Sequence, residues 1–313
     1  MIKNYQNNLS AIRGLSFLMV VIFHYTYQFS RVIIDSPIDS YFLKFCGYGV
    51  YLFFILSGRL IGSKLYSEHS ASRFLTSRLI RIYPTYLFCA SFSFLLFKII
   101  AEYNRELTSI DLFYNLSFLV FFTETPRIDG VYWSLYLEVL FYMYVALLIK
   151  VKKYTKYILI VCGIIVLANS DSIVAKLITL NGTLPFFILG IIENKIPKIQ
   201  KVLLFSIALL LILIDPKVLY HEYAILYFIY LTLSRSKLSS SVTNFLSQIG
   251  RISYTGYLIH QGVFFALFMK LERMNSGFVE SYTGALVLTL LSILLIYTFI
   301  EKKATAYLYG LVK

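Results

Sequence analysis

Long apolar runs separated by short polar connections extend along the whole chain. They fall at roughly 10–29, 46–65, 79–101, 131–149, 157–169, 183–194, 202–215, 219–234, 249–269 and 281–300. Several are close to the ~20 residues that an α-helix needs to cross the hydrocarbon core of a bilayer. The fifth, sixth and seventh runs are shorter, which fits half-helices or helices covered by their neighbours. The pattern predicts an all-α, polytopic membrane protein with about ten transmembrane helices.

Composition indicates the same class of protein. Of 313 residues, 58% are hydrophobic and only 14% are charged, whereas a soluble domain carries about 25% charged residues. There are too few charged residues to cover a water-facing surface, so lipid is the expected solvent. The 27 Phe and 27 Tyr residues fit aromatic belts at the membrane interfaces, and they fit an aromatic-lined pocket equally well.

The net charge of +13 is explained by how the charges are distributed. When the connections are assigned alternately to two sides, basic residues gather on one side and acidic residues on the other. The basic side carries Lys3, Lys64, Arg73, Arg78, Arg81, Lys150, Lys152, Lys153, Lys156, Lys195, Lys198, Lys201, Arg235, Lys237, Arg251, Lys302, Lys303 and Lys313. The other side carries four basic residues, Arg31, Lys44, Arg105 and Arg127, among many acidic ones: Asp35, Asp39, Glu102, Glu106, Asp111, Glu124 and Asp129. The positive-inside rule makes the basic side cytoplasmic, with both termini inside, and leaves no charge pattern that calls for a nucleic-acid partner.

The remaining class signals support one embedded domain. No soluble domain or strong repeat interrupts the pattern, so residues 1–313 are predicted to form a single membrane domain, with the connection 102–130 as a candidate extracytoplasmic cap. The first run lacks a small-residue cleavage site and is predicted to be a retained helix. The cysteines and the four histidines show no metal-ligand spacing, so no metal and no permanently bound cofactor is expected.

Three ionisable residues are predicted to lie at membrane depth, where each is costly and therefore a functional candidate. His24 follows Arg13 by eleven residues, which is about 16 Å along a helix. His260 lies about 14 Å beyond Arg251 by the same rise. Glu138 lies seven residues into the fourth run, one helical turn from a tyrosine at 142.

Each of these residues also has a structural interpretation. His24 and His260 could be neutral rings that hydrogen-bond to neighbouring helices, and Glu138 could form an ion pair with an arginine. For His24 the functional interpretation is general-base catalysis, because a neutral imidazole in an apolar setting keeps a lone pair on one nitrogen.

Two arginines one turn apart open the third run. Arg78 and Arg81 share one face of the predicted helix. They could be positive-inside anchors, or they could form an anion clamp at the cytoplasmic mouth of a cavity, because guanidinium groups bind phosphates bidentately. Arg59 would add to the same field or extend to the interface.

Four blocks of sequence resemble the acyltransferase-3 family of membrane enzymes. They are Leu9–Leu15 followed by His24, then Gly49–Gly58, Arg78–Pro84 and Trp133–Glu138. Weaker similarities follow at Leu184–Gly190, Gly250–His260 and Ile300–Lys302, so the ordered set covers nearly the whole chain. Within the second block, a tyrosine at position 51 stands where the family often has aspartate.

The resemblance implies a membrane O-acyltransferase, most simply an O-acetyltransferase. The apolar, Tyr- and Lys-rich composition favours a multi-pass protein of the bacterial inner membrane, although a eukaryotic organelle membrane would fit the same topology. The donor would be cytoplasmic acyl-CoA, such as acetyl-CoA, and the acceptor a hydroxyl of a surface polysaccharide, such as an O-antigen, or of a lipid-linked sugar. Transfer could be direct, or it could pass through an acyl group held on the protein. The implied site comprises His24 and Glu138 as catalytic residues, Arg13, Arg78 and Arg81 as donor-binding residues, and Trp133, Tyr142 and His260 as substrate-binding residues.

A transporter of a lipid-linked sugar or another amphiphile is the main alternative. Intramembrane charges and short apolar segments near Gly182 and Pro185 are typical of transporters. Against this interpretation, the sequence shows no paired halves with matching interrupted helices. A membrane scaffold without chemistry is a third interpretation, which the joint presence of the candidate site residues disfavours.

Overall fold

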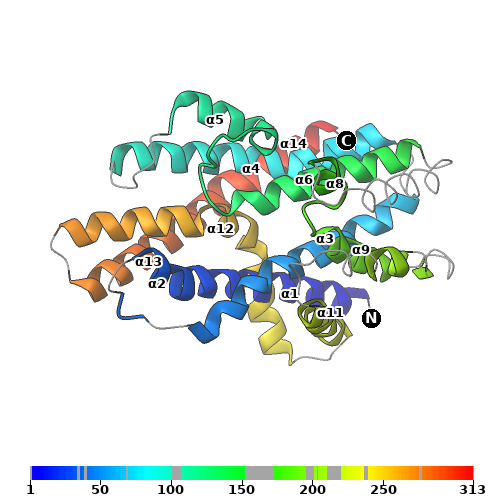
Figure 1. The fold of residues 1–313 in the computed structure, drawn as a ribbon, viewed down its shortest axis with the longest axis horizontal. Helices are drawn as coiled ribbons and strands as arrows, with labels where there is room; N and C mark the ends of the chain where they lie inside the picture. The colour runs from blue at the N-terminus through cyan, green and yellow to red at the C-terminus, as the bar shows by residue number, and fades with distance from the viewer. Residues whose placement is uncertain are drawn as a thin grey trace. The chain divides into compact units, whose positions relative to one another are not determined.

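A computed structural model describes most of the chain. The described residues are 2–33, 36–38, 41–67, 70–100, 107–151, 173–194, 201–202, 204–209, 220–235, 239–274 and 277–312. Every element among them is helical (Figure 1), which confirms the predicted all-α class for these residues. The predicted run 157–169 and the later part of 202–215 lie outside the described residues.

The longer helices coincide with the apolar runs. They are α1 (Ile2–Phe23), α3 (Gly49–Ser67), α4 (Ala71–Ile100), α6 (Tyr132–Lys150), α11 (Tyr220–Arg235), α12 (Ser240–Arg273) and α13 (Phe278–Ile296). The shorter α-helices are α2 (Phe29–Val32), α5 (Ser109–Leu116), α8 (Ile173–Ile178), α9 (Leu184–Ile192) and α14 (Lys302–Val312). A π-helical turn, His24–Gln28, joins α1 to α2, and another, Tyr297–Glu301, joins α13 to α14. Residues Tyr41–Tyr48 and Leu119–Phe122 form 3₁₀-helices.

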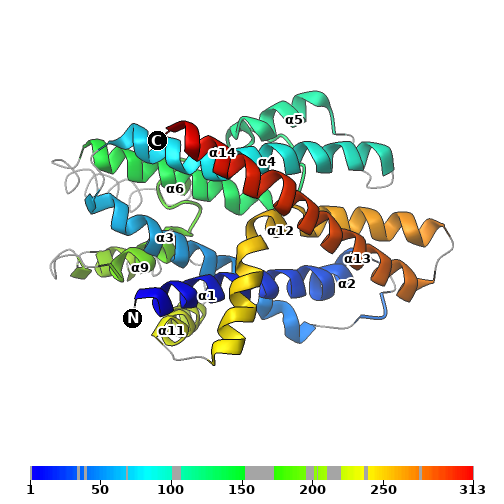
Figure 2. The same ribbon diagram turned by 180° about the vertical axis from the view of Figure 1, so that it is seen from behind.

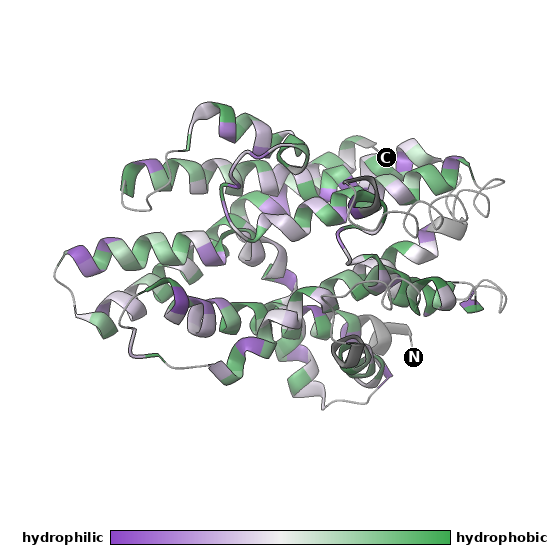
Figure 3. Cartoon of the chain, in the orientation of Figure 1, coloured by the Kyte–Doolittle hydropathy of each residue, from purple (hydrophilic) through white to green (hydrophobic). Residues whose placement is uncertain are grey.

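Five helical stretches within the described residues are long and apolar enough to cross a membrane. They are Asn7–Val32, Tyr41–Lys64, Ala71–Ile100, Tyr132–Lys150 and Phe278–Leu311. Hydrophobic residues recur along the helices, with hydrophilic residues interspersed among them (Figure 3). The chain therefore has several candidate spans, as expected of a multi-pass membrane protein, while the predicted total of about ten and the inside location of both termini stay predictions.

Two of the apolar runs are much shorter than their helices. Residues 79–100 of the third predicted run belong to the 30-residue α4, and 249–269 belongs to the 34-residue α12. The starts are set by polar residues: the Ser70 hydroxyl accepts a hydrogen bond from the backbone N–H of Arg73, and the Ser239 hydroxyl accepts one from Val242. A serine before the first turn satisfies a backbone donor that the helix leaves open. Hydropathy alone therefore missed the polar first turns of both helices.

The chain groups into two compact units. Unit 1 comprises residues 1–20, 45–76 and 137–248, and unit 2 comprises residues 21–44, 77–136 and 249–313. Helices α1, α4, α6 and α12 each contribute residues to both. The prediction of one domain over residues 1–313 stays a prediction.

In unit 1, α3 packs against α9 through small residues (Figure 1). A side chain at Gly58 would collide with the backbone of Phe187, and one at Gly190 would collide with the backbone of Ile55. At Gly62, one turn after Gly58, an added side chain would meet the Asn194 side-chain amide first and the Cα of Ile191 at 3.1 Å. Such Gly-x-x-x-Gly spacing lets helix backbones approach closely where no hydrophobic effect drives association within lipid. The glycines therefore set the distance between α3 and α9.

In unit 2, an aromatic core joins the end of the first span to α12 and α13. The buried residues are Tyr25, Phe29, Phe264, Phe265, Phe268 and Ala285. The rings of Tyr25 and Phe264 stack with their centroids 4.0 Å apart. The second half of α12 and the start of α13 lie side by side (Figures 1 and 2). This packing holds the π-helical turn His24–Gln28 in place.

Unit 2 also contains a buried amide hub in the segment predicted as a cap. The Asn115 side chain is fully buried. Its Oδ1 accepts hydrogen bonds from the Tyr136 hydroxyl at 2.8 Å and from the Ile128 backbone N–H at 3.1 Å. Its Nδ2 donates to the Pro126 carbonyl at 3.0 Å, and the Tyr86 hydroxyl donates to the Asn115 carbonyl at 2.9 Å. Through these hydrogen bonds, Asn115 links the loop after α5 to α4 and α6.

Candidate functional site

His24 begins the π-helical turn His24–Gln28 at the end of α1. π-helical turns are rare, and they occur frequently at functional sites because they shift the side chains that follow out of the α-helical register. The His24 side chain is half-buried, so part of its ring stays accessible. The hydropathy pattern of the sequence does not predict this turn.

The ring of His260, on α12, lies directly beside His24. Nε2 of His260 is 3.2 Å from Nδ1 of His24, and the two rings meet edge to face with centroids 4.9 Å apart. His260 is completely buried. The two histidines predicted independently from membrane depth therefore form one pair in unit 2.

Two tyrosines fasten the backbone around this pair. The Tyr25 hydroxyl donates to the backbone carbonyl of His260 at 2.9 Å. The Tyr282 hydroxyl, from α13, donates to the backbone carbonyl of Tyr25 at 2.7 Å. The position of the pair is thus fixed from three helical segments.

A buried carboxylate near the start of α6 reaches the same part of α12. Asp129 is 1% exposed, and its Oδ2 accepts a hydrogen bond from the backbone N–H of Gly262 at 2.9 Å. Its Oδ1 accepts one from the N–H of Val131 at 3.2 Å. Close by, the hydroxyls of Ser134 and Tyr257 lie 2.6 Å apart. The charge pattern of the sequence assigns Asp129 only to the acidic side of the membrane and does not predict this contact. The one local signal is its position, since Asp129 and a glycine come just before an apolar run.

Glu138, in unit 1, receives two hydroxyl groups on one oxygen. Ser57, from α3, and Tyr142, one turn along α6, each donate to Oε1 of Glu138 at 2.6 Å. Two donors on one oxygen suit a carboxylate that acts as an acceptor. The structure therefore brings together two of the predicted site residues, Glu138 and Tyr142, and adds Ser57, which sequence reasoning had placed only within a motif.

The predicted arginines occupy different units. Arg78 and Arg81 are half-buried and one turn apart on α4, in unit 2. Arg13 is half-buried on α1, in unit 1. Trp133 is half-buried in the first turn of α6, in unit 2.

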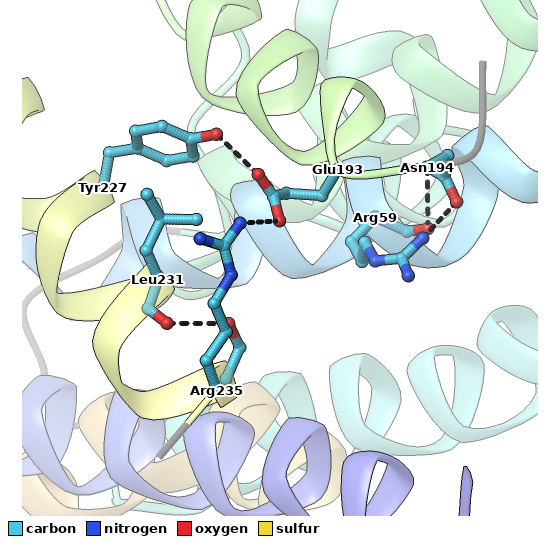
Figure 4. Close-up of polar contacts among 7 residues, drawn as sticks. Arg59, Glu193, Asn194, Tyr227, Leu231 and Arg235 are labelled. Atoms are coloured by element: carbon cyan, nitrogen blue, oxygen red, sulfur yellow. Dashed lines mark hydrogen bonds and ion pairs between the residues drawn. The ribbon is translucent and has the colours of Figure 1, made fainter. Parts of the chain in front are cut away.

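Arg59 takes part in a reciprocal contact at the end of α9 (Figure 4). Its guanidinium donates to the side-chain oxygen of Asn194, whose amide donates back to the carbonyl of Arg59 at 3.2 Å. Next to it, Glu193 accepts from Tyr227 at 2.9 Å and pairs with Arg235 at 3.0 Å. These contacts give Arg59 and Glu193 structural roles that link α3, α9 and α11.

Comparison with known proteins bears directly on the chemistry of these groups. The profile of the acyltransferase domain of the acyltransferase-3 family matches residues 6–300. A protein of Acidianus two-tailed virus, ORF330, whose name proposes an acetyltransferase, is 28% identical over 161 residues. That match covers 51% of this chain and 46% of the viral protein, so the chain spans about half the length of this relative. No solved structure matches the chain significantly.

Proposed function

The chain belongs to the acyltransferase-3 family and is a membrane acyltransferase, and from this premise we propose that it acylates a hydroxyl of a surface polysaccharide or a lipid-linked sugar. The donor is acyl-CoA, with acetyl as the first choice of acyl group, as the name of the viral relative suggests. The proposed location is the bacterial inner membrane, with both termini in the cytoplasm.

One observation carries the proposal. The His24 side chain is half-buried, and its Nδ1 lies 3.2 Å from Nε2 of the buried His260. A ring fixed in this way is suited to general-base work. His24 takes the proton of the acceptor hydroxyl as the hydroxyl oxygen attacks the thioester carbonyl carbon. The carbon–sulfur bond then breaks, and the CoA thiolate takes the proton from His24. An oxygen ester and free CoA thiol are the products, with no net gain or loss of protons.

The arginines are the proposed donor site. Arg78 and Arg81 lie one turn apart and are partly accessible, which suits paired guanidinium groups that grip the phosphates of CoA. Arg13, half-buried on α1 in unit 1, is proposed as a further donor-binding residue. Arginine serves here better than lysine because its planar group binds two phosphate oxygens at once.

Glu138 and Tyr142, both in unit 1, are proposed to bind the acceptor. The carboxylate accepts hydrogen bonds from hydroxyl groups already, and sugar hydroxyls offer the same donor. Trp133 is proposed to stack on the apolar face of a sugar ring.

Replacing Glu138 by Gln keeps the shape of the side chain and removes its charge. We expect kcat/KM for the acceptor to fall about 10- to 100-fold, because a hydrogen bond to a charged group contributes about 1.5–3 kcal/mol. Steady-state kinetics at saturating acyl-CoA measure the change. Met143→Leu, at an exposed position of the same helix, serves as the matched control and should leave kinetics unchanged. If Glu138→Gln keeps the wild-type kcat/KM, Glu138 does not bind the acceptor.

The proposed function is tested with purified protein in lipid nanodiscs. Acetyl-CoA is supplied with and without the lipid-linked sugars of the native host, and free CoA thiol and sugar-bound acetyl are both measured. We expect thiol release that depends on the sugar and equals the acetyl ester formed. The surface glycan of a gene-deletion strain should lack that ester by mass spectrometry. A chemically unchanged glycan that reaches the surface in smaller amounts, together with no thiol release, would instead identify a transporter.

A further inference from the structure

The hydrogen bonds around His260 define where its proton lies. Nδ1 of His260 is 2.9 Å from the backbone carbonyl of Tyr257 and 3.2 Å from that of Gly256. A carbonyl oxygen can only accept a hydrogen bond. Nδ1 of His260 must therefore carry hydrogen, whatever the state of the other nitrogen.

The other nitrogen of His260 then determines the state of His24. The His260 ring is completely buried, and a charge without water around it is costly, so the neutral ring is the expected state. In a neutral ring protonated at Nδ1, Nε2 keeps its lone pair and acts as an acceptor. This Nε2 faces Nδ1 of His24 at 3.2 Å. The hydrogen of that contact must then come from Nδ1 of His24.

We propose that His260 is a positioning residue that holds His24 in its Nδ1-protonated tautomer and leaves Nε2 of His24 as the basic nitrogen. The proposal rests on the acyltransferase function proposed above, since it names the atom of His24 that takes the proton. It gives His260 a role different from the substrate contact that the resemblance implied, because its ring is completely buried and its Nε2 lies 3.2 Å from His24.

The surroundings of the pair support a fixed geometry. Tyr25 holds the His260 carbonyl, and Asp129 holds the N–H of Gly262 two residues later. α12 therefore cannot turn the His260 ring away from His24 without breaking buried hydrogen bonds. When His24 gains the acceptor's proton at Nε2, its Nδ1–H becomes part of a cation and the bond to His260 strengthens. The pair thus favours the charged state of His24 that forms during transfer.

Two amide substitutions at position 260 separate this role from a general structural role. In His260→Gln, the amide oxygen reaches the place of Nε2 and can accept from His24. In His260→Asn, the shorter amide reaches only the place of Nδ1, so it satisfies the helix carbonyls and removes the acceptor that Nε2 of His260 offers to His24. Groups that orient a metal-ligating histidine typically contribute 10- to 100-fold, and we expect a similar range for a group that orients a histidine base. We expect His260→Asn to lower kcat about 10- to 100-fold with KM changed less than about twofold, and His260→Gln to recover most of that loss.

The tautomer itself is observable without any substrate. Protein labelled with ¹⁵N-histidine gives nitrogen–proton correlations that distinguish the two neutral tautomers, and the spectrum of His24→Gln assigns the His24 signals among the four histidines. We expect the Nδ1-protonated form of His24 in the wild type and in His260→Gln, and a shift toward the Nε2-protonated form in His260→Asn.

The two measurements distinguish failure of this inference from failure of the proposed function. An Nε2-protonated His24 in the wild type, or an unchanged His24 tautomer in His260→Asn, overturns the inference even if acyl transfer proceeds. Absence of acyl transfer in the wild type, with the expected tautomers present, overturns the function and leaves the assignment of hydrogens intact. If both variants fail to fold, the wild-type spectrum alone tests the inference: an Nδ1-protonated His24 supports it and an Nε2-protonated His24 overturns it.

Discussion

His24→Gln reduces acyl transfer about 10³-fold at matched protein levels. General-base catalysis typically contributes 10²- to 10⁴-fold, and no group on the glutamine side chain can take the acceptor's proton. The loss should appear in kcat, with KM for acyl-CoA nearly unchanged, because the donor is proposed to bind through Arg13, Arg78 and Arg81 and not through His24. Transfer of labelled acetyl from acetyl-CoA to the host glycan measures the effect.

The control for this substitution lies in the same helical segment. Ser30→Ala, six residues after His24, removes a hydroxyl that donates to the Tyr27 carbonyl at 2.9 Å. It disturbs the π-helical segment without touching either histidine, so kcat should stay within about twofold of wild type. If His24→Gln keeps more than about a tenth of wild-type activity, His24 is not the base, and a different group must take the proton.

The sequence predicted the helices because lipid imposes a strong rule. A segment that crosses hydrocarbon must be apolar over about 20 residues, so hydropathy located the interiors of α1, α4 and α6 directly. α12 shows the limit of that rule. No stretch of α12 is apolar enough to count among the five candidate spans, because polar residues such as Ser253, Thr255 and His260 are buried against protein.

The candidate site was only partly predictable for a related reason. His24 was identified by its depth and by its spacing from Arg13, both local features of one helix. Its pairing with His260 joins residues 236 positions apart, and nothing local to either segment encodes that contact. The tautomer depends further on the carbonyls of Gly256 and Tyr257, which become relevant only once the ring orientation is known.

The close approach of α3 and α9 was likewise hidden, although its glycines were visible. Gly58 and Gly190 were noted only as parts of family motifs. Glycine spacing on one helix indicates a close neighbour but cannot name it. The structure identifies the neighbour, because the Cβ positions of the two glycines point into each other's helix backbone. This contact leads to a large expected effect on stability.

Gly190→Ala destabilises unit 1 by about 1–3 kcal/mol, the usual cost of forcing an extra carbon into a packed interface. The added carbon would collide with the Ile55 carbonyl and the Arg59 backbone nitrogen. Neither is the end of a flexible side chain, so α3 and α9 must move apart and lose the stacking of Tyr51 on Phe186. Thermal unfolding in detergent should show a lower midpoint and earlier thiol labelling of buried cysteines such as Cys46.

Gly310→Ala is the matched control, because it is the same substitution in a helix with open space around the added carbon. Alanine is the better helix former by about 1 kcal/mol, so this variant should unfold at or slightly above the wild-type midpoint. The test is that the two variants shift the unfolding midpoint in opposite directions. If the protein tolerated no added methyl group anywhere, both midpoints would fall. A Gly190→Ala protein as stable as Gly310→Ala would mean that α3 and α9 do not depend on backbone contact, and that the small residues of α3 face lipid or another helix instead.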